Sequence, residues 1–88
     1  MNRVEMIREK LTSALAPESL EIIDRSSEHA GHEGAKSGGG HFDVIIVSTA
    51  FNEMGTVQRH RAIYDALGDA MKTEIHALSI RAYTPQEF

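Results

Sequence analysis

The stretch HFDVIIVS, residues 41–48, decides the fold of this chain. Its bulky side chains Phe42, Val44 and Ile46 alternate with the residues between them, and a period of two along the chain indicates a β-strand. The stretch SLEIIDRS, residues 19–26, predicts another strand earlier in the sequence. Adjacent strands joined by one connection commonly pair antiparallel, so we expect these two to form a hairpin.

The segment that joins these two strands has an unusual composition. It is SSEHAGHEGAKSGGGH, residues 26–41, and it contains three of the five histidines and five of the seven glycines of the chain. A connection of this length without secondary structure of its own is uncommon inside a compact domain and is usually functional or disordered. The composition of this segment alone does not show whether it is functional or disordered, so the other parts of the sequence are needed to distinguish the two.

Two amphipathic helices are expected on either side of the hairpin. Residues 3–15 carry aliphatic side chains at helical spacing, and Pro17 ends this helix. Residues 56–71 show the same spacing, with Thr56 as the N-cap. A short turn or helix is expected between the second strand and this helix, near Phe51.

The stretch IHALSIRAY, residues 75–83, predicts a third strand, with His76, Leu78, Ile80 and Ala82 on one face. The helix before it supplies the crossover connection that a third strand needs.

The last residues, TPQEF, have threonine at a cap position and proline at the first helical position, so we expect a further helix to start at Thr84. The order helix, strand, strand, helix, strand predicts the α+β class. Its simplest form is one three-stranded sheet with two main helices on one face and a short extra helix. We expect residues 1–88 to form a single domain of this kind.

The composition excludes several classes of protein. The chain has 88 residues and no cysteine, so it offers no disulfide and no thiolate, and a metal must be bound by His, Asp or Glu or shared with a partner. A formal net charge of −4 argues against nucleic acid as the main ligand, because Lys and Arg drive phosphate binding. No apolar stretch approaches the roughly 18 residues of a membrane span. Residues 1–11 carry scattered charges instead of an uninterrupted apolar segment, so we expect no targeting segment there. We therefore expect a protein without membrane contact, most simply in a bacterial cytoplasm.

No enzyme motif is present in the sequence. It contains no G-x-S-x-G turn for a serine nucleophile, and in GAKSGGG, residues 34–40, the glycines stand on the wrong side of the lysine for a phosphate-binding loop. We expect no catalytic activity.

The histidines are the strongest candidates for chemistry. His29 and His32 lie in the glycine-rich segment, and neutral imidazole is a common metal ligand. Their spacing matches no standard zinc pattern, so by itself a solvated loop is favoured over a self-sufficient metal site. For His76, at the start of the third strand, and for His41, a structural role is the simpler explanation. His60 lies between two arginines, where a solvated basic helix face is expected.

The densest positive cluster is QRHRAIYDAL, residues 58–67. Arg59 and Arg61 on a helix could contact phosphates. The simpler explanation is a surface helix in which Arg61 pairs with Asp65, four residues further along. We favour this explanation because the cluster is too small for useful affinity at physiological salt.

Three stretches taken together resemble a known family. HFDVIIVSTAF, RHRAIYDAL and IHALSIRAYTPQEF, in this order and at these separations, resemble the BolA family of small proteins, over nearly the whole chain. The resemblance implies an αββαβ core with an added short helix, similar to the type II KH-like fold. This agrees with the order obtained from periodicity.

The resemblance also implies a function. Members of the BolA family bind monothiol glutaredoxins and share a [2Fe-2S] cluster with them. In the family, the histidine of the V/I-H-A-L motif is a cluster ligand, which corresponds to His76 here. A second ligand comes from the loop between the first two strands, for which His29 is our first choice and His32 its rival. The expected role is an adaptor or regulator in iron–sulfur trafficking or iron and redox sensing. The cluster's other ligands would be a glutaredoxin cysteine and glutathione, so the isolated chain would bind no cofactor.

The alternative function also follows from the family, because some BolA-like proteins are described as DNA-binding transcriptional regulators of stress response and cell shape. The candidate contacts here are Arg59, Arg61, Lys72 and Arg81. The chain departs from the family pattern after Phe51 and at its last residue. No G-x-x-G turn joins two of the expected helices, so the backbone clamp by which KH domains hold RNA is missing. In the free state we expect a monomer or a weak homodimer.

Overall fold

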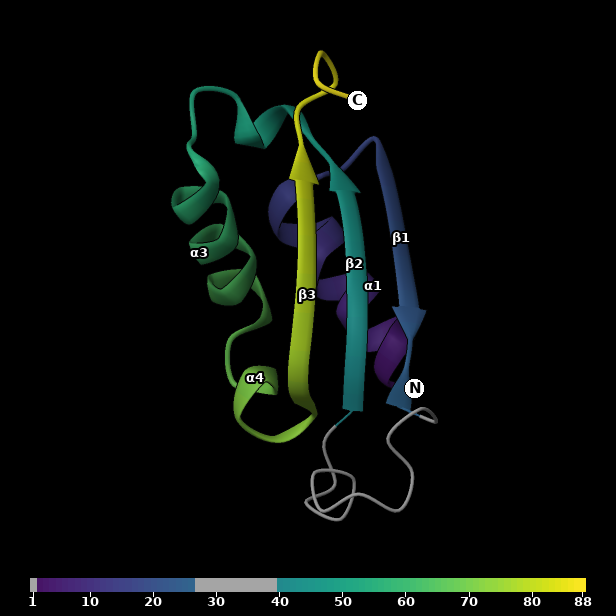
Figure 1. The fold of residues 1–88 in the computed structure, drawn as a ribbon. Helices are drawn as coiled ribbons and strands as arrows, with labels where there is room; N and C mark the ends of the chain where they lie inside the picture. Colours follow the sequence, from purple (N-terminus) through teal and green to yellow (C-terminus); the bar gives the residue numbers. More distant parts are fainter. Residues whose placement is uncertain (1, 27–39) are drawn as a thin grey trace.

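The computed structural model describes residues 2–26 and 40–88 of the chain. Its centre is a three-stranded sheet in the order β1-β2-β3, formed by β1 (Ser19–Asp24), β2 (Gly40–Val47) and β3 (Ile75–Tyr83). β1 pairs antiparallel with β2, and β2 pairs parallel with β3, so β2 is the central strand (Figure 1). The three predicted strands and the hairpin of the first two are confirmed.

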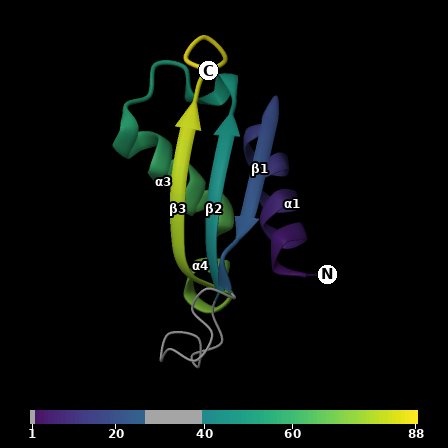
Figure 2. The ribbon, with the colours of Figure 1, turned by 45° about the vertical axis from the view of Figure 1, so that its right-hand side comes forward.

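The main helices lie on one face of this sheet. They are α1 (Arg3–Leu15) and α3 (Thr56–Leu67), and none of the described helices covers the opposite face (Figures 1 and 2). The 3-10 helix η2 (Thr49–Phe51) is the short element expected near Phe51, and α4 (Ala70–Thr73) is a single turn before β3. The α+β class is confirmed. None of the described helices is long and apolar enough to cross a membrane.

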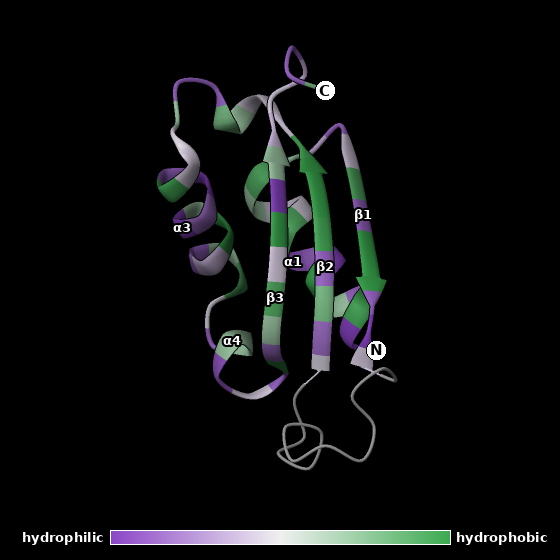
Figure 3. Ribbon diagram, viewed as in Figure 1, coloured by the Kyte–Doolittle hydropathy of each residue, from purple (hydrophilic) through white to green (hydrophobic). Residues whose placement is uncertain are grey.

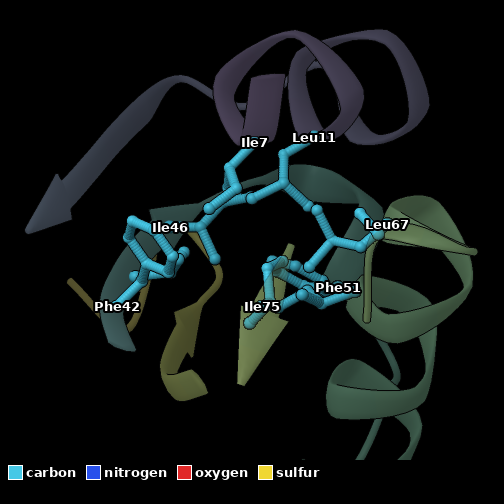
Figure 4. Packing of buried hydrophobic residues seen from close by; sticks show 10 residues of the cluster. Ile7, Leu11, Phe42, Ile46, Phe51, Leu67 and Ile75 are labelled. Atoms are coloured by element: carbon cyan, nitrogen blue, oxygen red, sulfur yellow. The ribbon is translucent and has the colours of Figure 1, made fainter. Parts of the chain in front are cut away.

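The hydrophobic core lies between the sheet and the two main helices. Phe42 and Ile46 of β2 point into it toward Ile7 and Leu11 of α1 (Figure 4), and Val44 is buried in the same cluster. The other buried members of the cluster are Phe51, Ile63, Leu67, Ala70 and Ile75. Figure 3 shows hydrophobic residues running along the upper part of β2. Because full burial of a Leu, Ile or Phe side chain contributes about 1.5–3 kcal/mol, this layer is the main source of stability.

The start of α3 differs from the prediction by one residue. Its N-cap is Gly55, and Thr56 is the first helical residue. The Gln58 side chain accepts a hydrogen bond from the backbone N–H of Gly55 at 2.8 Å. Glycine has no side-chain oxygen to cap the helix, so Gln58 supplies the side-chain half of the capping interaction from within the first turn.

The end of α3 also differs from the prediction. The single helix predicted over residues 56–71 is interrupted at Gly68, which has φ +55°. This backbone conformation is accessible to glycine at little cost and ends the helix at Leu67. The chain then forms α4 as a separate turn, so the prediction of one continuous helix is wrong.

The pairing of β2 with β3 contains an irregularity at its start. Gly40 pairs with Ile75, whereas His41 pairs with Ala77, so His76 is the extra residue of a β-bulge. The predicted face is wrong for His76, because the bulge interrupts the alternation and leaves this residue exposed. The residues that keep the predicted inward face are Leu78, Ile80 and Ala82.

Residues 84–88 form a turn, so the further helix predicted from Thr84 is absent from this described part of the chain. The backbone N–H of Glu87 donates to the Thr84 carbonyl at 3.0 Å, and the Glu87 carboxylate accepts from the Thr84 N–H at 2.8 Å. The Glu87 side chain thus accepts from the Thr84 N–H as in the capping box of a helix start, but the described residues form only a single turn here.

Candidate functional site

His76 lies at the end of the sheet where β2 and β3 begin. The neighbouring backbone is fixed, because the N–H of Gly40 donates to the carbonyl of Glu74 at 3.1 Å and Ile75 is buried in the core. His76 itself is exposed, as the extra residue of the bulge. A rigid strand start thus presents an accessible imidazole.

His41 is the neighbour of His76 across the two strands. The centroids of the two imidazole rings are 5.0 Å apart, and the ring planes are inclined by 46°. The backbone of His41 is held on the side of β1, since its N–H donates to the Ser26 hydroxyl at 3.1 Å and its carbonyl accepts from the Arg25 N–H at 2.8 Å. From the sequence alone only a structural role is expected for His41, and its contact with His76 cannot be predicted because it depends on the bulge.

The ends of the glycine-rich segment meet at the same place. His29 and His32 lie outside the described residues. The segment that contains them leaves the described chain after Ser26 and returns at Gly40. Ser26 is bonded to His41, and Gly40 is paired with Ile75, next to His76. Both attachment points of the segment are therefore close to the histidine pair.

The start of this segment is anchored by Asp24. Its carboxylate accepts a hydrogen bond from the backbone N–H of Ser26 at 2.8 Å. Hydrogen bonds from the side chain and backbone of Ser26 lower the pKa of Asp24 below its ordinary value. The ionised carboxylate thus fixes the direction in which the chain leaves β1.

A shallow hollow of about 210 Å³ opens beside His41 on the uncovered face of the sheet. Arg25 and Asp43, which form an ion pair, line it together with Ala77 and Ser79 of β3. The hollow beside His41 is therefore open to solvent and combines this ion pair with the apolar side chains of Phe42 and Leu78.

The described residues do not form a complete metal site. Within residues 2–26 and 40–88, no three or more His, Asp or Glu side chains are grouped so that they could hold a metal ion. His41 and His76 offer two imidazoles at most, and a tetrahedral site needs four ligands. The donor set fits a metal group whose remaining ligands come from elsewhere.

Arg59 points inward. Its guanidinium donates to the carbonyls of Met54 at 2.9 Å and Ala82 at 3.1 Å, and it forms a two-point ion pair with Glu87. It lies 6.0 Å from the centre of the Phe51 ring, and only 14% of its side chain is exposed. The hydrogen bond and the charge of Glu87 raise the pKa of Arg59, and Arg59 lowers the pKa of Glu87 to about 2. These contacts leave Arg59 little capacity for an external phosphate.

The other three basic candidates lie on separate surfaces. Arg61 is exposed on α3, and among the described residues no ion pair joins it to Asp65. Arg81 lines a hollow on the uncovered face of the sheet. Lys72, on α4, lies 3.5 Å from the carboxylate of Asp69. The fold does not gather these side chains into one basic patch.

Comparison with known proteins assigns the family. The model of the family described as BolA-like protein matches residues 11–87. The chain is 49% identical over 86 residues to SufE-like protein 1, chloroplastic/mitochondrial, of Arabidopsis thaliana, covering 92% of this chain and 23% of that protein. It is 46% identical over 89 residues to Protein BOLA1, chloroplastic, of the same plant, covering 98% of this chain and 56% of that protein. The chain thus spans about a quarter of the length of SufE-like protein 1 and just over half of the length of Protein BOLA1.

A bacterial relative and a solved structure agree with this assignment. The DNA-binding transcriptional regulator BolA of Escherichia coli K12 is 39% identical over 84 residues, covering 96% of this chain and 77% of that protein. The solved BolA domain of SufE1 from Arabidopsis thaliana superimposes with a TM-score of 0.86 at 48% identity, covering 100% of this chain and 98% of that domain. From its sequence and its fold, the chain belongs to the BolA family.

Proposed function

We propose that this protein is an adaptor that binds a monothiol glutaredoxin and shares a [2Fe-2S] cluster with it. In this role it acts in iron–sulfur trafficking or iron and redox sensing, without catalysing a reaction. His76 is the proposed ligand from the strand. The second ligand comes from the segment between β1 and β2, with His29 as the first choice and His32 as its rival.

The observation that carries this proposal is the position of His76. It is exposed at a rigid strand start, beside a second imidazole and close to both ends of the histidine-containing segment. Three residues of chain span at most about 11 Å and six at most about 22 Å, so His29 has the shorter reach from Ser26 and His32 the longer. One rigid and one loop-borne ligand would suit a cluster that is passed between proteins.

The chemistry of the donor set supports a shared group. A chain without cysteine cannot supply the four thiolates of an ordinary cluster. Two imidazoles can complete a cluster whose other ligands are a glutaredoxin cysteine and glutathione, and imidazole ligation raises the reduction potential of such a cluster. Each histidine must be neutral to coordinate, so we expect binding to weaken at acidic pH.

The experiment is a titration of a [2Fe-2S] monothiol glutaredoxin with this protein, followed by visible circular dichroism. The wild-type chain should give a new spectrum that saturates at equal stoichiometry, and His76→Ala should abolish it. One of the two variants His29→Ala and His32→Ala should also abolish it, which identifies the loop ligand. No new spectrum with the wild-type chain would overturn the proposal.

His60→Ala is the matched control for these histidine variants. His60 lies on α3 next to Arg59, whose guanidinium reaches the carbonyl of Ala82 near the far end of β3 from His76. The control should therefore behave like the wild-type chain. The backbone amide NMR spectrum of each variant should match that of the wild-type chain, which would confirm that the fold is intact.

The DNA-binding alternative has less support from this fold. Its four candidate contacts were Arg59, Arg61, Lys72 and Arg81, of which Arg59 is engaged internally and the others lie apart. The similarity to a relative named as a DNA-binding regulator keeps the alternative worth testing. A steep loss of affinity with added salt, together with sequence preference, would favour it, whereas weak uniform binding would indicate nonspecific electrostatics.

The cellular setting is also a proposal. A bacterial cytoplasm, with the free protein a monomer or weak homodimer, is our prediction from the sequence, although the relatives include plant organelle proteins. Sedimentation of the isolated chain at several concentrations would test the oligomeric state.

A further inference from the structure

The outer side of α3 carries a patch that the proposed function does not use. It consists of four side chains at helical spacing, which we call the α3 face: Val57, His60, Arg61 and Tyr64. These residues line a shallow hollow of about 290 Å³. Val57 is 70% exposed and Tyr64 is 40% exposed, so an aliphatic and an aromatic side chain both face solvent here.

Arg61 supplies an uncommitted charge at this patch. Arg59, two residues earlier, is turned inward and bonded to backbone carbonyls and to Glu87. Arg61 is exposed, and within residues 2–26 and 40–88 no carboxylate pairs with it, not even that of Asp65 one turn further along. The two arginines of one helix thus have different roles, one structural and one available to an external partner.

We infer that the α3 face docks a segment of a partner protein that combines an apolar side chain with a carboxylate. The carboxylate would pair with the guanidinium of Arg61, which can bind it at two points. The apolar side chain would cover Val57 and Tyr64. Tyrosine and arginine are enriched among the residues that dominate protein–protein binding, and side chains at i, i+3, i+4 and i+7 on one helix are typical of helical docking.

The charge of the patch argues against two other occupants. In a symmetric dimer through the α3 face, the two Arg61 side chains would lie near each other and repel. A nucleic acid would gain little from a single available arginine on a chain of net charge −4. An acidic and apolar protein segment satisfies both the charge and the exposed apolar side chains.

The position of the α3 face separates this contact from the proposed cluster site. Arg59, in the same turn as His60, bonds the carbonyl of Ala82, whereas His76 lies at the opposite end of β3. A partner on the α3 face would leave the His41–His76 end accessible. The inference therefore stands or fails independently of the cluster.

The test is a selection of displayed random peptides of about twelve residues on the immobilised full chain. Peptides that also bind an Arg61→Glu variant are removed by counter-selection. We expect the surviving peptides to be enriched in Asp or Glu next to a large apolar residue. A synthesised peptide should shift the amide signals of the α3 face and lose about tenfold or more in affinity with Arg61→Glu. Replacing its acidic residue by lysine should restore binding to that variant.

The matched control is Arg81→Glu, which makes the same charge change on the uncovered face of the sheet. It should leave peptide binding unchanged. The inference is overturned if no peptide survives the counter-selection, if the surviving peptides have no acidic preference, or if they shift signals elsewhere. It is also overturned if only a single-stranded oligonucleotide, or only self-association of the chain, perturbs the α3 face in an Arg61-dependent way.

Discussion

Arg59 and Glu87 face each other as a two-point ion pair, with Nη1–Oε1 at 2.6 Å and Nη2–Oε2 at 3.0 Å. The same guanidinium binds the carbonyls of Met54 and Ala82, so one side chain of α3 connects the loop before the helix, the end of β3 and the C-terminal turn. Lysine carries the same charge but not the planar fork of donors. Arg59→Lys should therefore lower the midpoint of urea unfolding. The control Arg61→Lys, on the exposed side of the helix, should leave the midpoint unchanged, and equal effects of the two variants would contradict this role.

The Glu87 carboxylate makes the stability of the fold depend on pH. Arg59 and the Thr84 N–H lower its pKa from 4.5 to about 2. A carboxylate whose pKa is lowered by folding stabilises the protein fully above its unfolded pKa and loses this contribution as the pH falls to its folded pKa. The difference in unfolding free energy between the wild-type chain and Glu87→Gln should therefore shrink between pH 4.5 and about 2. Urea titrations at several pH values measure this difference, and a difference that stays constant over this range would refute the assignment.

Gly40 is required by close packing at the start of β2. A Cβ atom at this position would lie 2.6 Å from the Phe42 ring and 2.7 Å from the Ser26 hydroxyl. Phe42 is buried in the core and cannot move away. Gly40→Ala should therefore destabilise the protein by about 1–3 kcal/mol, measured by chemical denaturation. At Gly55 the new Cβ would meet only the Gln58 side chain, at 4.0 Å, so Gly55→Ala should cost less. If Gly55→Ala destabilised the protein more than Gly40→Ala, the Phe42 ring or the Ser26 hydroxyl would have moved to make room for the new Cβ at residue 40.

Ser48 links the core to two backbone groups. It is fully buried, and its hydroxyl donates to the Leu15 carbonyl at 2.6 Å and accepts from the Ala50 N–H at 3.0 Å. Ser48→Ala leaves both backbone groups without this partner, so a loss of about 1–3 kcal/mol in unfolding free energy is expected. The exposed Ser79 of β3 provides the comparison, because Ser79→Ala should have almost no effect. If Ser48→Ala lowers the unfolding free energy no more than Ser79→Ala does, a water molecule has replaced the Ser48 hydroxyl as the partner of the two backbone groups.

His41 should act on the proposed cluster through its contact with His76. His41→Ala removes the ring that lies 5.0 Å from His76, so His76 loses a neighbour that limits its orientation. The titration with [2Fe-2S] glutaredoxin should reach the wild-type spectrum, but only at a higher concentration of the variant. If His41→Ala abolishes the spectrum as His76→Ala is expected to, then His41 is itself a ligand and the role proposed for the loop histidines is wrong.

The elements that were predicted correctly are those whose pattern is local. Residues 3–15 and 75–83 have the predicted bounds, because the side chains of each element repeat with the period of its own backbone. The break of the long helix was also visible locally, in Gly68, but the apolar spacing on either side of it concealed the break. The α+β class follows from the order of such elements, as does the family from the stretches that include them.

The sequence predicted that histidines form the candidate site, but it did not predict which of them lie next to each other. His76 was identified from the family resemblance, but its contact with His41 joins residues 35 positions apart across a parallel pair of strands. Only the bulge after Gly40 brings the two rings together. In the same way, nothing near Arg59 in the sequence indicates that its partners are Ala82 and Glu87.

The sequence by itself determined the first helix, the three strands, the order of the main elements, the absence of cysteine and the family of this protein. Each of these depends on residue identity or on spacing within one element, so each can be recognised along the chain. Only the tertiary structure decided which arginine of α3 is buried, which histidines meet, and where His76 points. Those outcomes depend on strand register and on packing between distant elements, where a shift of one residue moves a side chain to the other face of the sheet.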